Sequence, residues 1–392
     1  MRKIVIIGAG ILGCSLAREL ASKKAGTILV LEKEPEAGLH ASSRNSGVIH
    51  SGINQKPGTL KAKFCVEGSR LLREYCRQRG VPMRECGTLV VAKSSEEELC
   101  LKRLYDMGQA CGVPGLEMLD TPQIKEREPM AQGASGLFSP TGAVVDAKVL
   151  VETIKREAEE LGAKFYFHQQ VKKIECQKIF TYNRVFQPDH IINCAGVFAD
   201  RIAHMMGCGQ GLHIVPFLGS YFEVTNIDVR GMIYQTPDLR FPFLSTHLTR
   251  KTDGRVIAGP TAILTPGRES YNGRIQWKDS FEMLGSISFY KMIFGKEFLK
   301  MGWKFFKQIL SKKVFAREIQ ALVGPFRHDQ LKPYPPGIRA QLVDPKGNLV
   351  QDFVVEYRET STHILNCVSP GLTSSLAFAA HVTEQIRNRG GL

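Results

Sequence analysis

The feature that most constrains the fold of this chain is a glycine-rich turn between a strand and a helix near the N-terminus. Residues 3–7 read KIVII, an apolar, β-branched run typical of a strand buried on both faces. The turn GAGILG follows at residues 8–13, and apolar residues then recur at spacings of three and four, which indicates a helix. A second apolar run at residues 27–31 ends on Glu32. This order of strand, turn, helix and strand predicts the start of an α/β fold.

Each part of this motif suits a bound dinucleotide. Gly8 permits the tight turn, Gly10 lets the backbone approach a pyrophosphate, and Gly13 lets the helix pack closely on the strand. The helix N-terminus offers N–H groups and a partial positive charge to the phosphates. Glu32 lies 19 residues after Gly13, where a carboxylate can accept hydrogen bonds from ribose hydroxyls. NAD and FAD both satisfy this half of the site.

The composition is that of an ordinary globular protein. The 392 residues are 43% apolar and 23% charged, enough for a large core and more than one domain. No uncharged apolar stretch approaches the roughly 18–20 residues that span a bilayer, and glycines interrupt the short apolar run at the N-terminus. We therefore expect a cytoplasmic protein. The ten cysteines include no C-x-x-C pair, which favours reduced thiols over disulfides or a metal site.

The net charge of +14 suggests an anionic partner, which could be nucleic acid, a membrane surface or an acidic substrate. Basic residues are concentrated at residues 296–310, where lysines fall on one helical face and Phe298, Phe305 and Ile309 fall on the other. This pattern predicts a helix lying in a membrane interface near a quinone acceptor, or an ordinary surface helix docked by its apolar face. Basic residues elsewhere are dispersed, so we do not expect a nucleic-acid partner.

Periodic patterns predict further elements around the first motif. Apolar residues at helical spacing predict helices over residues 60–79 and 149–161, and residues 164–167 are strand-like. The apolar run at residues 189–194 ends at Ala195 and Gly196, small residues that suit a backbone lying against a cofactor.

Many ordered segments resemble one family of flavoenzymes, the L-2-hydroxyglutarate dehydrogenase/oxidase family of the D-amino-acid-oxidase-like group. The similarity runs almost from end to end. The segments that carry it are RNSGVIHSG from Arg44, KPGTLKAKFCVEG from Lys56, CGTLVVA from Cys86, GAVVD from Gly142, DHIINCAGVFADRIA from Asp189, IVPFLGSYF from Ile214, RFPFLSTHLT from Arg240 and GIRAQLVD from Gly337.

The resemblance implies an α/β fold in which a Rossmann-like FAD-binding domain is interleaved with a mixed-sheet α+β substrate domain. We expect the FAD-binding domain over residues 1–75, 147–215 and 337–392, and the substrate domain over residues 76–146 and 216–336.

By the same resemblance, FAD is the cofactor. The small and polar residues of the loop at residues 39–52 suit a loop that wraps phosphate and passes close to a cofactor, or an ordinary polar loop. The segment at residues 369–375 precedes a helix and faces the flavin pyrimidine ring, where its N–H groups would stabilise the negative charge that develops on reduction. The expected cofactor-binding residues are Gly8, Gly10, Gly13, Glu32, Ser43, Arg44, Asn45, Ser46, Val171, Ala195, Gly196, Gly371, Thr373 and Ser374.

The implied reaction is oxidation of a 2-hydroxy acid to the 2-oxo acid. A guanidinium binds a carboxylate well, and Arg339 of the G-I-R segment is the expected anchor. The hydroxyl proton needs a base with a suitable pKa, which is commonly a histidine. We expect His247 to be the base or to orient the substrate, with His50 nearby.

This chain departs from the family pattern where the substrate is expected to bind. The family commonly has P-F-R-G where this chain has Leu218 as the third residue, so an arginine expected to face an anion is replaced. A dicarboxylate needs a second cationic anchor, for which Arg44 and Arg268 are candidates. A different 2-hydroxy acid therefore stays open as the substrate. So does the chemistry of an amino-acid or amine oxidase, or of a glycerol-3-phosphate-type dehydrogenase of the same fold.

Overall fold

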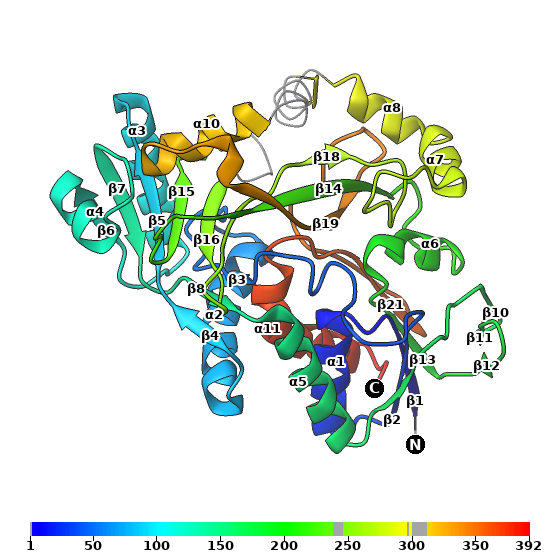
Figure 1. Ribbon diagram of the computed structural model, residues 1–392. Coiled ribbons are helices and arrows are strands. Elements are labelled where there is room, and N and C mark those ends of the chain that lie inside the picture. Colours follow the sequence, from blue (N-terminus) through cyan, green and yellow to red (C-terminus); the bar gives the residue numbers. More distant parts are fainter. Residues whose placement is uncertain (1, 238–245, 296–297, 300–311) are drawn as a thin grey trace.

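The computed structural model describes residues 2–237, 246–295, 298–299 and 312–392 of the chain (Figure 1). Its helices are α1 (Ile11–Ser22), α2 (Leu60–Arg79), α3 (Ser95–Ala110), α4 (Thr121–Arg127), α5 (Ala147–Glu160), α6 (Ala199–His204), α7 (Trp277–Leu284), α8 (Ile287–Ile293), α10 (Lys312–Val323) and α11 (Gly371–Asn388). None of these described helices is both long and apolar enough to cross a membrane.

A six-stranded sheet lies at the N-terminal motif. Its order is β20-β21-β13-β1-β2-β9, and β1 pairs in parallel with both β2 and β13. The strands are β1 (Lys3–Ile7), β2 (Thr27–Leu31), β9 (Lys164–Tyr166), β13 (His190–Asn193), β20 (Val354–Tyr357) and β21 (Ser361–Asn366).

The central place of β1 explains its continuous apolar sequence. Successive side chains of a strand point to opposite faces of the sheet. Ile4 and Ile6 pack into a core with α1, α5 and α11, whereas Val5 and Ile7 pack into a second core on the other face. Figure 1 shows α1, α5 and α11 gathered on one side of β1 and β2.

Among the described residues, nine strands form a second sheet. Its order is β18-β14-β17-β16-β15-β5-β7-β6, with β19 paired to β14. These strands are β5 (Thr88–Ala92), β6 (Glu117–Asp120), β7 (Ser135–Ser139), β14 (His213–Val224), β15 (Met232–Gln235), β16 (His247–Arg250), β17 (Val256–Gly259), β18 (Ile263–Leu264) and β19 (Leu331–Val343). The sheet is mixed because β15 and β5 are parallel, while the other paired strands among its described residues are antiparallel.

Two small sheets complete the described strands. One has the order β3-β8-β4, with β3 (Val48–Ile49), β8 (Ala143–Val145) and β4 (Met83–Glu85). The other has the order β10-β11-β12, with β10 (Lys173–Glu175), β11 (Lys178–Phe180) and β12 (Val185–Phe186). The division into two interleaved domains stays a prediction, although every strand of the six-stranded sheet comes from the ranges expected for the FAD-binding domain.

Candidate active site

The glycine turn is held so closely that two of its glycines cannot carry a side chain. Gly8 has φ of +103°, and a Cβ there would lie 2.5 Å from the Cys194 carbonyl oxygen. A Cβ on Gly13 would lie 1.9 Å from the Gly8 carbonyl oxygen. A Cβ on Gly10 would lie 3.0 Å from Ser42 Oγ. The turn therefore leaves its backbone open to a ligand while α1 packs tightly against β1.

Glu32 and the start of α1 both fit the ADP half of a dinucleotide. Gly10 supplies no side-chain cap, and the Ile11 N–H donates to Ser42 Oγ at 2.9 Å, so the N–H groups that follow in the first turn of α1 can face phosphate. Glu32 lies at the end of β2, and its Oε2 accepts a hydrogen bond from the Ala9 N–H at 2.7 Å. Its Oε1 accepts from the Glu34 N–H at 3.1 Å. The carboxylate is thus held beside the turn and is partly exposed, as a ribose ligand must be.

The loop at residues 39–52 is shaped by its own polar side chains. Asn45 Nδ2 donates to the Ala41 and Ser42 carbonyls, and its Oδ1 accepts from the Gly47 N–H at 2.7 Å. The Arg44 Nε donates to the Leu39 carbonyl at 3.0 Å. These contacts fix the backbone path of the loop; roles in binding FAD for Ser43, Arg44, Asn45 and Ser46 stay predictions.

Two other expected cofactor segments lie close to the turn. Gly196 has φ of +57° and open space where a Cβ would stand, and it follows the Cys194 carbonyl that contacts Gly8. The Ala195 N–H donates to Asn193 Oδ1 at 3.1 Å, which orients this segment. Val171 is half-buried and packs with the core that contains Val5. Their cofactor roles stay predictions.

The N-terminus of α11 contacts the loop through one hydroxyl. Thr373 Oγ1 accepts from the His50 N–H at 3.0 Å and donates to the Val48 carbonyl at 3.4 Å. Pro370 provides no side-chain cap for α11, and Ser374 is buried with no hydrogen-bond partner for its Oγ among the described residues. A helix N-terminus with uncapped N–H groups thus lies beside His50, where it can stabilise negative charge.

Arg339, His50 and Tyr221 form the electrostatic centre of the site. Burial lowers the pKa of the Arg339 guanidinium, whereas the nearby Tyr221 opposes this shift. Burial and the positive charge of Arg339 together lower the pKa of His50 to about 4. His50 is therefore neutral near pH 7 and can accept a proton. Tyr221, on β14, was not predicted as a site residue, and burial raises its pKa.

His247 lies behind Tyr234, an aromatic residue that lines a cavity next to His50. A cavity is lined by His50, Asn54, Tyr234 and neighbouring residues of the loop and β5. The His247 ring stacks on Tyr234 with a centroid distance of 4.1 Å and an interplanar angle of 13°, and it is buried. This arrangement suits a residue that positions Tyr234, while His50 lines the cavity directly. Tyr234 was also not predicted, and only the tertiary pairing of β15 with β16 brings it to His247.

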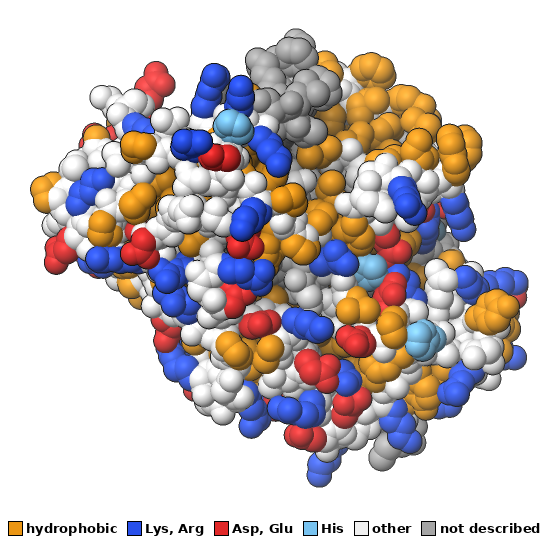
Figure 2. Space-filling view, viewed as in Figure 1, with side chains coloured by type: hydrophobic (Ala, Val, Ile, Leu, Met, Phe, Trp, Pro, Cys, Tyr) orange, Lys and Arg blue, Asp and Glu red, His pale blue; other side chains and the backbone are white. Residues whose placement is uncertain are grey.

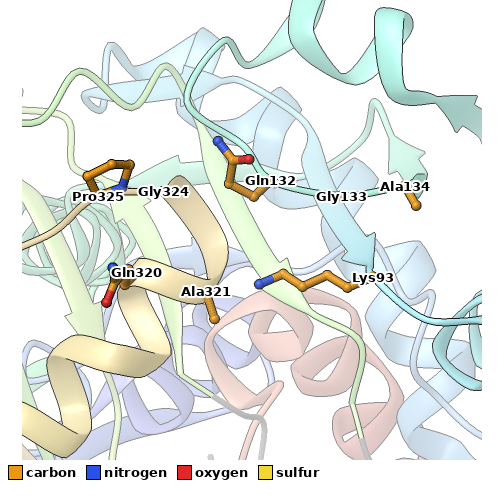
Figure 3. Close-up of a pocket in the computed structure, with 8 residues that line it drawn as sticks. All are labelled: Lys93, Gln132, Gly133, Ala134, Gln320, Ala321, Gly324 and Pro325. Atoms are coloured by element: carbon orange, nitrogen blue, oxygen red, sulfur yellow. The ribbon is translucent and has the colours of Figure 1, made fainter.

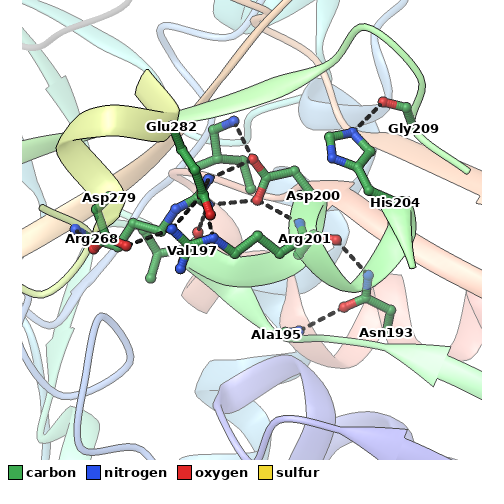
Figure 4. Close-up of polar contacts among 12 residues, drawn as sticks. Asn193, Ala195, Val197, Asp200, Arg201, His204, Gly209, Arg268, Asp279 and Glu282 are labelled. Atoms are coloured by element: carbon green, nitrogen blue, oxygen red, sulfur yellow. Dashed lines mark hydrogen bonds and ion pairs between the residues drawn. The ribbon is translucent and has the colours of Figure 1, made fainter. Parts of the chain in front are cut away.

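Arg268 is not a free carboxylate anchor, because its charge is already paired. Its guanidinium binds the Asp200 carboxylate through two contacts of 2.6 and 2.9 Å, and both side chains are buried. Figure 4 shows this pair within a network that also includes Arg201, Asp279 and Glu282. A bidentate pair of this kind fixes α6 against the segment before α7.

Arg44 is also occupied. Its guanidinium lies 4.3 Å from the Tyr271 ring centroid, in addition to its bond to the Leu39 carbonyl. The neighbouring Glu34, His40 and Glu269 could together offer ligands to a metal ion. Lys33 Nζ lies 2.6 Å from Glu269 Oε1, so the lysine already pairs with a carboxylate of this cluster. Hydrogen bonds from His40 and Lys33 lower the pKa of Glu269 to about 2 although burial opposes them.

Another hollow lies apart from this chemistry. It is lined by residues around Gln132 and the end of α10, including Lys93 and Gln320 (Figure 3). Lys93 is the only ionisable side chain in this lining among the described residues. None of the expected site residues borders it, so we assign the active site to the cavity at His50.

Comparisons with known proteins agree with this geometry. The family model described as FAD dependent oxidoreductase matches residues 3–385. The mitochondrial L-2-hydroxyglutarate dehydrogenase of Mus musculus is 35% identical and is aligned over 98% of this chain and 88% of that protein. The L-2-hydroxyglutarate dehydrogenase of Escherichia coli (strain K12) is 33% identical, over 99% of this chain and 93% of that protein.

Solved structures share the fold at lower identity. The reduced L-alpha-glycerophosphate oxidase of Mycoplasma pneumoniae with FAD bound superposes with a TM-score of 0.76 at 21% identity, covering 98% of this chain and 94% of that one. The glycine oxidase of Geobacillus kaustophilus superposes with a TM-score of 0.72 at 16% identity, covering 99% and 95%. The sequence relatives and the family model, together with the glycine turn and Glu32, show that this chain is an FAD-dependent oxidoreductase that belongs to the L-2-hydroxyglutarate dehydrogenase family.

Proposed function

We propose that this protein oxidises L-2-hydroxyglutarate to the corresponding 2-oxo acid. The observation that carries the proposal is that the half-buried Arg339 lies near His50, a neutral histidine that lines the cavity at the loop. Arg339 suits the carboxylate next to the reacting carbon, because a guanidinium binds a carboxylate in a bidentate manner. His50 suits the hydroxyl proton, because the charge of Arg339 and burial hold its pKa at about 4 and leave the ring neutral.

The remaining residues have supporting roles in this proposal. When bound, FAD supplies the acceptor for the two electrons that leave the substrate. The turn at Gly8, Gly10 and Gly13 with Glu32 holds its ADP half, and the N-terminus of α11 stabilises negative charge on its pyrimidine side. His247 positions Tyr234 against the substrate cavity.

Binding of substrate is expected to make His50 a better base. A bound carboxylate neutralises Arg339, and this removes one of the two causes that lower the His50 pKa. Proton transfer would thus be favoured only with the substrate in place.

The test is turnover of the purified flavoprotein with an artificial electron acceptor. The panel contains L-2-hydroxyglutarate, its D enantiomer, L-lactate, glycine, sarcosine and glycerol 3-phosphate. The proposal predicts turnover of L-2-hydroxyglutarate with release of the 2-oxo acid, and at least about tenfold lower kcat/KM for the other compounds. Higher kcat/KM for an amino acid or for glycerol 3-phosphate would reject it in favour of the corresponding reaction.

We propose further that this is a cytoplasmic protein which docks on an anionic bilayer surface and passes electrons to a membrane quinone. The support comes from α7, α8 and the residues next to them. Their exposed apolar side chains include Trp277 (65% exposed), Phe281 (66%), Ile287 (73%) and Phe294 (71%). Figure 2 shows hydrophobic side chains gathered over these two helices. A contiguous exposed patch of this kind is typical of an interaction surface.

Charge favours a lipid surface as the occupant. Lys278 and Lys291 lie on the same two helices, and the chain has a net charge of +14. The basic amphipathic pattern predicted at residues 296–310 continues the sequence, but all except Phe298 and Leu299 lie outside the described residues. Apolar insertion together with attraction to anionic lipid is how interfacial proteins bind.

Sedimentation with vesicles tests this surface. The holoenzyme should sediment with vesicles that contain phosphatidylglycerol, less with phosphatidylcholine alone, and less as salt rises. The variant Trp277→Ser/Phe281→Ser/Ile287→Ser should lose about tenfold or more in partition while retaining turnover with a soluble acceptor. Equal sedimentation of the variant and the parent protein would contradict the proposal.

A further inference from the structure

A dicarboxylate substrate requires a second cation in the cavity, and the predicted candidates do not supply it. Leu218 stands where the family pattern has an arginine, Arg268 is paired with Asp200, and the Arg44 guanidinium lies over Tyr271. If the proposed function holds, another residue must supply the second cation.

Lys61 lies in the first turn of α2, and that turn is fixed in place. The Leu60 and Lys61 N–H groups donate to the Asp352 carboxylate at 3.1 and 2.9 Å. The same carboxylate accepts from the Phe353 N–H at 2.8 Å. Asp352 therefore acts as a cap for α2 from a distant segment, and its oxygens are used by backbone N–H groups.

The face of α2 that carries Lys61 is turned towards His50. Cys65 lies one helical turn after Lys61, and residues four apart lie on one face of a helix. Cys65 Sγ donates to the His50 carbonyl at 3.5 Å. On another side of the loop, β19 passes so close that a Cβ on Gly337 would lie 2.0 Å from the Arg44 carbonyl oxygen. Arg339 follows two residues later, so α2 and β19 bring their cations to the same loop from different elements.

The ammonium group of Lys61 has no partner among the described residues. The structure records no ion pair or side-chain hydrogen bond for it, and the side chain is half-buried. Burial and, to a lesser extent, the charge of Arg339 lower the pKa of Lys61 to about 8, while the charge of Asp352 opposes the shift. The two thiols are neutral, because burial raises the pKa of Cys367 to about 12 and that of Cys65 above its usual range.

A desolvated cation without an anionic partner lowers the stability of the fold, unless an anionic ligand binds and pairs with it. We propose that Lys61 binds the distal carboxylate of a dicarboxylate 2-hydroxy acid, while Arg339 binds the carboxylate next to the reacting carbon. The site would then offer two cations to a substrate with two negative charges, while His50 stays neutral. A monocarboxylate would leave Lys61 unpaired, so Lys61 determines specificity for the dicarboxylate.

Binding of non-reacting acids to the oxidised holoenzyme tests this role without turnover. Butyrate is glutarate with one carboxylate replaced by hydrogen, so the two acids differ by the distal carboxylate. Their dissociation constants are measured from the change in flavin absorbance for the parent protein, Lys61→Met and Lys61→Arg. Lys63→Met is the matched control, because Lys63 lies on the same helix and is exposed. Flavin content and thermal unfolding establish that each variant is folded.

The proposal predicts that Lys61→Met weakens glutarate binding by about 10- to 100-fold and changes butyrate binding by less than about threefold. Lys61→Arg should recover part of the loss, and Lys63→Met should match the parent protein. Equal loss of both acids in Lys61→Met, or unchanged glutarate binding, would overturn the role of Lys61. Failure of the proposed function would instead show as no turnover of L-2-hydroxyglutarate by the parent protein, whatever the glutarate-to-butyrate ratio of the variants.

Discussion

At the residue scale, the site depends on one charge that sets the protonation of its neighbours. Arg339 is half-buried, and its charge contributes to the lowered pKa of both His50 and Lys61. Sequence patterns predicted Arg339 and His50 as site residues and placed the leading role on His247. They did not predict Lys61, Tyr221 or Tyr234, because only the folded chain shows which side chains are desolvated together.

The two histidines are expected to differ in their effects. His50→Gln should lower the rate of flavin reduction by about 10²- to 10⁴-fold, because a general base is lost from the cavity. His247→Gln should lower it by less than about tenfold, because this ring acts through Tyr234. Anaerobic stopped-flow absorbance measures both rates. A larger loss in His247→Gln than in His50→Gln would restore the role that the sequence suggested for His247.

Affinity for glutarate should depend on pH through Lys61. The Lys61 amine is charged below its pKa of about 8 and loses its charge above it, so glutarate affinity should be constant near pH 7 and fall above pH 8. His50 is already neutral over this range and Arg339 stays protonated. Titrations from pH 6.5 to 9.5 measure the effect, and Lys61→Arg should abolish it. A fall that persists in Lys61→Arg would assign the titration to another group.

At the element scale, the predictions were most accurate for strands and helices that the local pattern of apolar residues determines. The expected strand at residues 27–31 and the helix at residues 60–79 coincide with β2 and α2. The nine-stranded sheet could not be predicted in the same way. β5 pairs in parallel with β15, and β14 pairs with β19 across more than a hundred residues, so no local period records these neighbours. The approach of β19, which carries Arg339, to the loop at Arg44 likewise joins segments far apart in the sequence.

The contact between the glycine turn and α1 gives a prediction at this scale. Gly13→Ala should abolish FAD retention or folding, because the added Cβ would stand 1.9 Å from the Gly8 carbonyl oxygen. Gly162→Ala is the control for a steric clash. Its Cβ would meet no atom within 4 Å, and only the backbone φ of +100° disfavours the alanine. The ratio of flavin to protein after purification measures the outcome. Full flavin content in Gly13→Ala would contradict the tight packing of α1 on the turn.

At the scale of the whole molecule, one loop joins the glycine turn to the cavity at His50. The loop at residues 39–52 contacts the glycine turn through Ser42 and the cavity through His50. The residues that line this cavity include none of α7 or α8, whose apolar side chains are exposed (Figure 2), so docking on a lipid bilayer would leave the cavity residues in place. Substitutions on α7 and α8 are therefore expected to change lipid binding without changing turnover with a soluble acceptor.

The most direct test of the central claim is a single anaerobic reduction of the purified flavoprotein by L-2-hydroxyglutarate. The account predicts full bleaching of the flavin with one 2-oxo acid formed per flavin, and Lys61→Met should need a higher concentration of this substrate for the same rate. An enzyme that L-2-hydroxyglutarate leaves oxidised, while an amino acid or glycerol 3-phosphate bleaches it, would contradict the account.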